Sequence, residues 1–191
     1  MLSKTSIIIF MCCIAYALSQ TYKEVTYTDC GSKNVRISRL SYKPMPIVQP
    51  GTGTLSFAVA ATERIQGVIK AKIDIKRKVG GIALPVSCYI VQGEQVGSCT
   101  YPDFCALLKR VFKYEVHNCP AKLVQNGINC NCPISLARND LDIEMDVTLP
   151  SAPEYASWLS VGDFDIKLQA SVGQIEACYD MKFAVKPAGR P

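Results

Sequence analysis

Residues 140–149 read DLDIEMDVTL, a strict alternation of polar and apolar side chains. Successive side chains of an extended strand point to opposite faces, so a period of two gathers the apolar members on one face. They are Leu141, Ile143, Met145, Val147 and Leu149. The carboxylates Asp140, Asp142, Glu144 and Asp146 then occupy the other face. The segment therefore predicts a strand with one face in a core and one face in water.

The same period of two recurs along the chain. It is clear over residues 69–79, 164–172 and 175–185 and weaker over residues 25–30, 35–42, 54–61 and 82–88. In the first of these the apolar face reads Ile69, Ala71, Ile73, Ile75, Arg77 and Val79. Gly173 lies between two clear segments and predicts a tight hairpin. Such strands predict an all-β fold of about eight antiparallel strands, an immunoglobulin-like β-sandwich.

One segment departs from this pattern. Residues 103–113 read DFCALLKRVFK, in which Phe104, Leu107, Leu108 and Val111 recur at helical spacing. Pro102 precedes the segment, and proline is favoured where helices begin. We expect one short helix here.

The N-terminus has the features of a secretory signal peptide. Lys4 precedes an apolar run over residues 7–18, and Ala17 and Ser19 are small residues at the positions that signal peptidase requires. The run is shorter than the ~20 residues with which a helix crosses a bilayer. We expect cleavage after Ser19, which leaves a signal peptide, residues 1–19, and a single mature domain, residues 20–191.

Eight of the ten cysteines remain after this cleavage. An even number of cysteines in a secreted chain predicts a disulfide framework, here of four bonds whose pairing the sequence leaves open. Cys30 and Cys178 lie in the first and last predicted strands, which favours a bond that ties the two ends together. The other six surround the predicted helix: Cys88, Cys99, Cys105, Cys119, Cys130 and Cys132. We predict no metal site, because a single residue separates Cys130 from Cys132 and zinc knuckles use longer spacings.

Composition argues against several functional classes. The formal net charge is +5 with no run of like charges, so we expect no nucleic acid partner. His117 is the only histidine, and neither a G-x-S-x-G nor an H-E-x-x-H motif is present. We predict no catalytic residue and no cofactor. An enzyme that depends on His117, or a glycosidase that uses two of the carboxylates in residues 140–146, stays an alternative.

Lysines occupy the polar face of residues 69–79. They are Lys70, Lys72, Lys76 and Lys78. We interpret them as a solvated strand face, with attraction to anionic lipid headgroups as the alternative.

Three cysteine-containing motifs resemble the ganglioside activators of the ML lipid-recognition superfamily. They are GSCTYPDFC at residues 97–105, CP at residues 119–120 and GINCNCP at residues 127–133. Asp29 with Cys30, residues 43–51 and the SWL triplet at residues 157–159 extend the similarity over nearly the whole mature chain. These activators are lysosomal proteins that present sphingolipids to β-hexosaminidase A and are not themselves enzymes.

The resemblance implies a particular fold and disulfide pairing. It implies a β-sandwich opened into a cup, so that lipid tails enter between the two sheets. It also implies bonds that pair Cys30 with Cys178, Cys88 with Cys99, Cys105 with Cys132 and Cys119 with Cys130. Extraction of a tail of about 16 methylenes from a bilayer costs roughly 13 kcal/mol, which an apolar cavity must offset.

The loop after residues 140–149 is the candidate lipid site. Residues 150–162, PSAPEYASWLSVG, are long for a hairpin loop and contain the only tryptophan of the chain. We predict that Tyr155, Trp158 and Leu159 contact lipid or a membrane, because aromatic side chains favour the membrane interface. The resemblance adds Phe164 to this mouth of the cup. The alternative interpretation places Trp158 in the core.

Two departures from the family bear on the ligand and the compartment. Ala83 stands where relatives carry a membrane-contacting tryptophan, and the chain has no N-x-[ST] glycosylation motif. Mannose-phosphate sorting acts on N-glycans, so secretion to the extracellular space is as well supported as residence in the lysosomal lumen.

These observations predict a secreted or lysosomal lipid-binding and transfer protein. We expect it to extract a glycolipid, such as a ganglioside-like sphingolipid, or a phospholipid from a membrane and to present it to a hydrolase or another membrane. Its expected partners are the lipid, the membrane surface and a lysosomal or secreted glycosidase that it activates. The alternative is a lipid-sensing recognition module that acts with a receptor.

Overall fold

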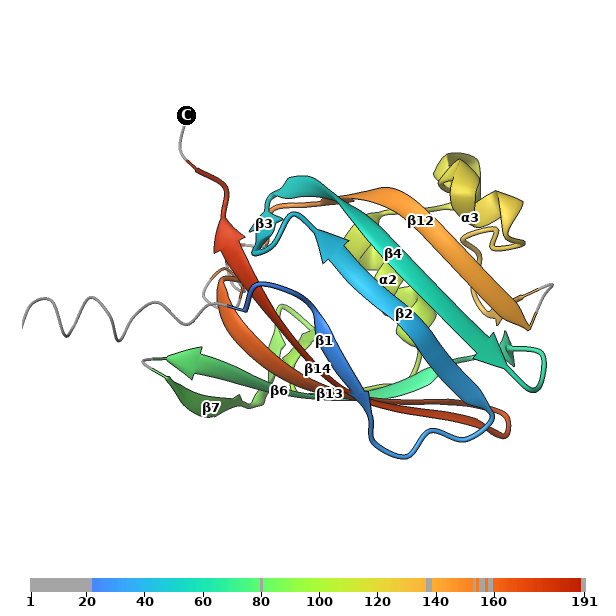
Figure 1. The fold of residues 1–191 in the computed structure, drawn as a ribbon, viewed down its shortest axis with the longest axis horizontal. Helices are drawn as coiled ribbons and strands as arrows, with labels where there is room; N and C mark the ends of the chain where they lie inside the picture. Colours follow the sequence, from blue (N-terminus) through green and yellow to red (C-terminus); the bar gives the residue numbers. More distant parts are fainter. Residues whose placement is uncertain are drawn as a thin grey trace, which may run out of the picture.

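Two sheets of unequal size face each other across an apolar interior (Figure 1). The computed structural model describes residues 22–79, 81–136, 139–152, 154, 157 and 160–189. The larger sheet has the strand order β1-β14-β13-β6-β10, with β3 beside β14 and β7 beside β6. The smaller sheet has the order β12-β4-β2. Every described strand pair of these two sheets is antiparallel except β3 with β14, which is parallel.

The strands of the larger sheet are β1 (Thr26–Asp29), β3 (Ile47–Gln49), β6 (Lys70–Val79), β7 (Ile82–Val86), β10 (Thr100–Tyr101), β13 (Gly162–Val172) and β14 (Ile175–Pro187). Those of the smaller sheet are β2 (Val35–Lys43), β4 (Gly51–Ala61) and β12 (Asp140–Leu149). Two short pairs complete the strands, β5 (Gln66–Gly67) with β11 (Ile134–Ser135) and β8 (Cys88–Val91) with β9 (Glu94–Gly97). The helices are α2 (Phe104–Phe112) and α3 (Ala121–Gln125), with a 3₁₀ helix at Val116–Asn118 between them.

The strands expected from the period of two are confirmed. In β12 the burial of side chains alternates as the sequence predicts, with Leu141 and Val147 buried and the carboxylates exposed. The expected strand over residues 82–88 is divided between β7 and β8, with Ser87 between them. The main strands therefore form because each can bury one face.

The expected helix is confirmed as α2, and a second short helix is present. Asp103 caps α2, since its carboxylate accepts a hydrogen bond of 3.0 Å from the backbone N–H of Ala106. The expectation of a single helix is incomplete because α3 follows Pro120. Its five residues span little more than one turn, too short for a helical period to show in the sequence.

The best-packed part of the core belongs to the smaller sheet. Its buried members are Val59, Leu136, Leu141, Ile143, Met145 and Val147. Phe112 of α2 and Leu123 of α3 pack against this cluster. The helical segment therefore covers the inner face of the smaller sheet near β12.

The inner face of the larger sheet is packed less completely. Ile75 of β6, Ile166 of β13 and Met181 of β14 share this face by register, and all three are only partly buried. The two sheets approach each other at β2, which contacts β1 and β14. A filled sandwich would bury these side chains, so the sandwich is opened into a cup, as expected.

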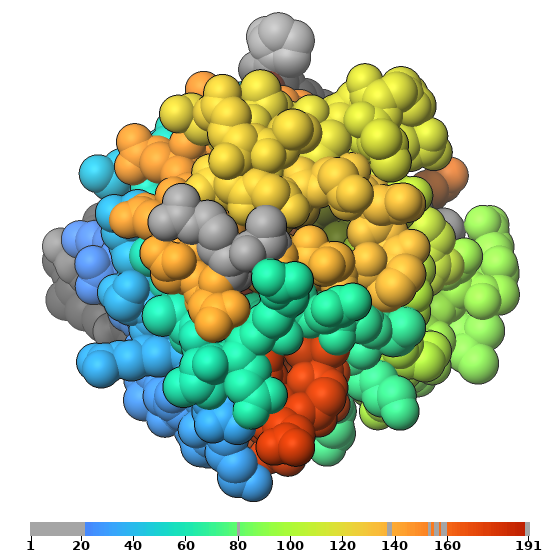
Figure 2. Space-filling view, turned by 90° about the vertical axis from the view of Figure 1, so that its right-hand side faces the viewer, coloured from blue at the N-terminus to red at the C-terminus, as the bar shows by residue number. Residues whose placement is uncertain are grey.

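The two ends of the sandwich carry different elements. Figure 2 looks onto one end, where the yellow segment with α3 and the red turn between β13 and β14 lie on the same surface. Figure 1 shows the other end, from which the hairpin of β6 and β7 projects. The start of β13 and the end of β14 also lie at this second end.

Four disulfides connect the eight described cysteines, with the pairs that the family resemblance implies. They are Cys30–Cys178, Cys88–Cys99, Cys105–Cys132 and Cys119–Cys130. The first joins residues 148 positions apart and ties the end of β1 to β14. Cys88–Cys99 closes the hairpin of β8 and β9. Cys105–Cys132 and Cys119–Cys130 hold the helical segment, which buries few side chains of its own.

Candidate lipid-binding site

An apolar cavity of about 310 Å³, here called the inner cavity, lies between the smaller sheet and the helical segment. Leu55 and Met145 line it from the sheet, Leu108 and Phe112 from α2, and Leu123 from α3. The one charged residue among its described lining is a lysine of α2. Such a lining offers dispersion contacts and almost no hydrogen bonds, which suits a hydrocarbon chain.

A second cavity of about 580 Å³, here called the mouth cavity, lies on the other side of α2. Ile73 and Ile75 line it from the inner face of β6, and Leu107 and Val111 line it from α2. Its charged lining residues are Glu94, Arg110 and Lys113, of which Arg110 and Glu94 form an ion pair. Both cavities fall within the range of about 300–1,000 Å³ that is usual for ligand sites.

The loop predicted to contact lipid borders the mouth cavity. Its predicted lipid-contacting residues Tyr155, Trp158 and Leu159 lie outside the described residues. On either side of them, Ala152 and Ser160 line the mouth cavity. The described residues at both ends of the loop that carries the tryptophan therefore border this cavity.

Phe164 lies in the interior rather than on the surface. It is buried, and its ring centroid is 5.9 Å from that of Phe183 on the neighbouring strand. Its contact with lipid stays a prediction.

Sequence reasoning missed an apolar hairpin tip, here called the apolar lip. It consists of Val79 at the end of β6 and Ile82 and Leu84 of β7, with exposed fractions of 52%, 66% and 48%. Val79 pairs with Ile82, and Arg77 pairs with Leu84, so the lip continues the inner face of the larger sheet out into solvent. The signal in the sequence was the pair of apolar residues on either side of Ala83.

Arg77 is a second residue that sequence reasoning missed. It is partly buried, and its Nε atom donates a hydrogen bond of 3.0 Å to the carbonyl oxygen of Val161. The signal was present, because Arg77 interrupts the apolar row of its strand. A cation therefore faces the interior beside the loop that carries Trp158.

Tyr42 of β2 brings a polar atom to the inner face of the smaller sheet. Its ring is buried, and its hydroxyl has no hydrogen-bond partner among the described residues. Burial raises the pKa of this hydroxyl, which stays a neutral donor.

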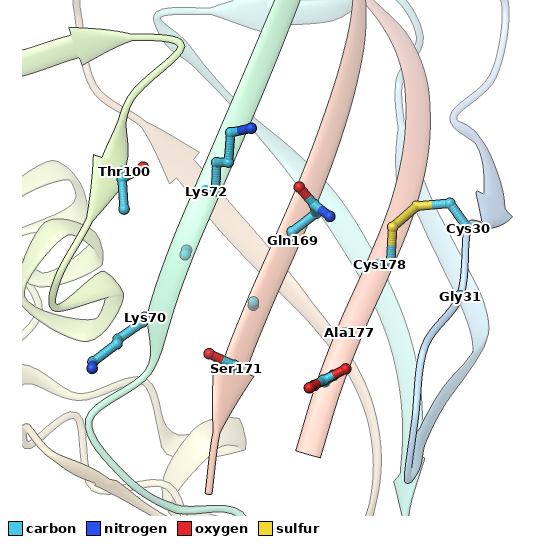
Figure 3. Close-up of a pocket in the computed structure, with 12 residues that line it drawn as sticks. Cys30, Gly31, Lys70, Lys72, Thr100, Gln169, Ser171, Ala177 and Cys178 are labelled. Carbon is cyan, nitrogen blue, oxygen red and sulfur yellow. A yellow bond between two sulfur atoms is a disulfide. The ribbon is translucent and has the colours of Figure 1, made fainter. Parts of the chain in front are cut away.

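The lysine row of β6 lies on the outer face of the larger sheet, away from both cavities. A pocket of about 390 Å³ lies there. Figure 3 shows Lys70 and Lys72 at one side of it and the Cys30–Cys178 bond at the other. The ammonium of Lys72 lies 3.5 Å from the Asp74 carboxylate. These contacts are those of a solvated, ion-paired strand face.

The residues considered for catalysis are exposed. The Nδ1 atom of His117 lies 3.4 Å from the Glu115 carboxylate on the surface of the 3₁₀ helix. On β12, Asp146 accepts a hydrogen bond of 2.8 Å from Thr54 of β4, and Glu144 accepts one of 2.9 Å from Ser56. These carboxylates thus take part in cross-strand bonds on the outer face of the smaller sheet.

The described fold and its cavities define a class of protein, a disulfide-bonded β-sandwich whose interior is apolar and partly hollow. Within that class, the chain belongs to the ML domain family, whose model matches residues 24–184. None of the described helices is long and apolar enough to cross a membrane.

Curated relatives share most of the chain. The ganglioside GM2 activator of Mus musculus is 29% identical over 163 residues, which cover 85% of this chain and 80% of the relative. The ganglioside GM2 activator of Macaca fascicularis is 27% identical over 139 residues, covering 73% and 70%. A solved Niemann-Pick type C2 protein from Japanese carpenter ant aligns with a TM-score of 0.38 and 13% identity, covering 84% of this chain and 99% of that one. Because that TM-score is low, family membership rests on the sequence match.

Proposed function

We propose that this protein encloses the apolar tails of a membrane lipid in its cup, lifts the lipid from the membrane and presents it to a hydrolase or to another membrane. The observation that carries the proposal is the partly buried inner face of the larger sheet, which borders the mouth cavity, together with the apolar inner cavity against the smaller sheet. Apolar side chains left in contact with water cost free energy that a bound lipid tail would recover.

Membrane contact is proposed for the end of the sandwich at which the apolar lip projects. Ile82 and Leu84 offer exposed apolar surface there, and the proposed contact also includes Tyr155, Trp158 and Leu159 in the loop beside the mouth cavity. Phe164 would then meet the lipid inside the cup. Ala83 contributes no aromatic ring to this surface, which supports shallow, reversible binding.

The proposed ligand is a glycolipid or a phospholipid, and the proposed enzyme partner is a glycosidase. The support is family membership together with relatives whose names describe activators acting on a ganglioside. The proposed compartment is the extracellular space or the lysosomal lumen, with residues 1–19 removed as a signal peptide. Four disulfides support an oxidising compartment.

Native mass spectrometry of the purified, secreted protein tests ligand binding directly. We expect a population whose extra mass equals that of a lipid, and dissociation should release that lipid for identification of its headgroup. A protein that carries no lipid after purification and takes up none from vesicles would refute the proposal.

Vesicle binding tests the proposed membrane surface. Trp158→Ala and Ile82→Ser should each weaken binding to vesicles and slow lipid extraction, because both remove apolar surface, while the unfolding transition stays close to that of the wild type. Val116→Ser is the matched control, since Val116 is 61% exposed on the 3₁₀ helix, outside the proposed surface. If Trp158→Ala unfolds the protein, Trp158 belongs to the core. If the control weakens binding as much as Ile82→Ser, the surface is wrongly placed.

A further inference from the structure

Arg77 is the one charged residue in the inward-facing row of β6. The row continues from Ile73 and Ile75, which line the mouth cavity, through Arg77 to Val79 at the apolar lip. Register places Arg77 opposite Phe164 of β13 and Leu84 of β7. The guanidinium therefore lies between the apolar lip and the mouth cavity, in a row of apolar side chains.

Among the described residues, Arg77 makes one side-chain hydrogen bond, through one of its five N–H donors. Its Nε atom donates to the carbonyl oxygen of Val161, and its side chain passes over Gly162. All sixteen Asp and Glu residues belong to the described part of the chain, and none of them forms an ion pair with Arg77. Within the described part of the chain, the two terminal nitrogens of the guanidinium thus have no carboxylate partner, although a partly buried charge is normally paired.

The Tyr42 hydroxyl is a second donor without a partner among the described residues, and it lies at the same end of the sandwich as Arg77. Tyr42 pairs with Leu55, which lines the inner cavity, and its ring packs against Gly53 near the start of β4. The start of β4 contacts β3, and β3 pairs with the end of β14. Gly162, over which the Arg77 side chain passes, pairs with Val185 near that same end of β14. These contacts place Tyr42 and Arg77 at the same end of the sandwich. Figure 1 shows the ends of β2 and β14 together with β3 at one end of the sandwich.

Among the described residues that line the mouth cavity, cations outnumber acids. Of these described residues, Glu94 is the one acid, and it pairs with Arg110, while Lys113 forms none of the described ion pairs. Arg77 adds another cation next to this lining. An anionic group that enters here meets cations that have no ion-pair partner among the described residues, in surroundings less screened than bulk water.

We infer that Arg77, assisted by the Tyr42 hydroxyl, binds the acidic group of the lipid headgroup, so that the cup selects anionic lipids over neutral ones. This inference rests on the proposed lipid-binding function. A guanidinium donates two parallel hydrogen bonds to a phosphate, sulfate or carboxylate, and such charge-assisted bonds are stronger than bonds to neutral oxygens. The lipid tails would occupy the apolar cavities while the acidic group stops at Arg77, beside the mouth.

Competitive extraction from mixed vesicles tests the inference. The vesicles contain equal small fractions of three lipids with matched acyl chains: phosphatidylglycerol, a sialylated sphingolipid and an uncharged glycosphingolipid, in a phosphatidylcholine background. Protein-bound lipid is separated by size exclusion and measured by mass spectrometry. The readout is the ratio of each acidic lipid to the uncharged one, and the two acidic arms distinguish a phosphate from a carboxylate.

We expect the wild type to enrich at least one acidic lipid, and Arg77→Gln to lower that ratio about tenfold while extraction of the uncharged lipid persists. Arg36→Gln is the matched control, because Arg36 is exposed on β2 and the substitution removes the same charge. Tyr42→Phe should lower the ratio without reducing the free energy of unfolding, because the hydroxyl it removes has no described partner.

Each negative result of the extraction experiment bears on a different hypothesis. If the wild type extracts no lipid at all, the proposed function fails. If it extracts lipid without enriching either acidic one, or if Arg36→Gln changes the ratio as much as Arg77→Gln, the inference about Arg77 is overturned and the proposed function stands. Should Arg77→Gln fail to fold, Arg77→Lys and Arg77→Met replace it, and the inference requires the ratio to be retained in the first and lost in the second.

Discussion

The backbone N–H of Ile37 donates a hydrogen bond of 2.7 Å to the hydroxyl of Tyr179. Ile37 lies in β2 of the smaller sheet and Tyr179 in β14 of the larger one, so this bond joins the two sheets. It lies at the irregularity in the pairing of β2 with β4, between Ile37 and Arg39. Tyr179 is the largest fully buried side chain described, so the bond is shielded from water at the closed edge of the cup.

Removal of the Tyr179 hydroxyl should destabilise the fold. Tyr179→Phe leaves the N–H of Ile37 without its acceptor, and an unpaired buried donor costs about 1–3 kcal/mol. The measurement is the free energy of unfolding in urea. Tyr27→Phe is the control, because the Tyr27 ring lies 6.4 Å from that of Tyr179 but its hydroxyl has no hydrogen bond among those described. Equal stability of the two variants would show that the bond between the sheets contributes nothing.

The disulfides should differ in their contribution to stability. Cys30–Cys178 closes a separation of 148 residues and Cys88–Cys99 one of 11. Chain-entropy estimates therefore predict losses of about 5 kcal/mol for the double replacement Cys30→Ser with Cys178→Ser and about 3 kcal/mol for Cys88→Ser with Cys99→Ser. Urea unfolding of both variants without reductant measures the difference. A greater loss from the shorter loop would contradict the estimate and indicate that the hairpin of β8 and β9 depends on its bond for local order.

Asp29 should make stability depend on pH in the acid range. Hydrogen bonds from the backbone N–H groups of Ser32 and Gly31 hold the pKa of its carboxyl below the usual value. A lowered pKa in the folded state contributes stability that is present above the unfolded value, near pH 4, and is lost as the pH falls through the folded value. Asp29→Asn keeps an acceptor oxygen but does not titrate, so its stability difference from the wild type should shrink between about pH 6 and about pH 2. A constant difference across that range would assign the effect to another group.

Whether a strand or helix could be predicted from the sequence depends on its length. Strand β12 was predictable because its ten residues alternate without exception, and α2 because its apolar residues follow Asp103 at helical spacing. Two-residue strands such as β5 and β10 form through their tertiary contacts and leave no period in the sequence. The hollow interior was not predictable from the pattern, since a filled sandwich and an open cup share the same alternation.

Arg77 shows a different limit of sequence reasoning. Its position in an apolar row was visible in the sequence, yet a cation on a strand face can also turn to solvent at a sheet edge. Only the contact with Val161 and the register with Phe164 place it beside the mouth. The role of such a residue depends on the loop it meets, and that loop follows a strand far away in the sequence.

Gly162 should be required for the position of Arg77. It has a φ of +136°, and a Cβ atom there would lie 2.9 Å from the Nε atom of Arg77, closer than these atoms can pack. Gly162→Ala should therefore push the guanidinium away from Val161 and lower the ratio of acidic to uncharged lipid extracted from mixed vesicles. Gly31→Ala is the matched control, because Gly31 has a φ of +121° and a Cβ atom there would meet no atom within 4 Å, so the substitution adds backbone strain without a contact. Both variants should lose stability, since a side chain disfavours these conformations, and only Gly162→Ala should lose selectivity. If both glycine variants retain the wild-type ratio, there are two explanations. Either a residue other than Arg77 holds the acidic group, or the guanidinium reaches that group without support from Gly162. The ratio measured for Arg77→Gln separates these two explanations.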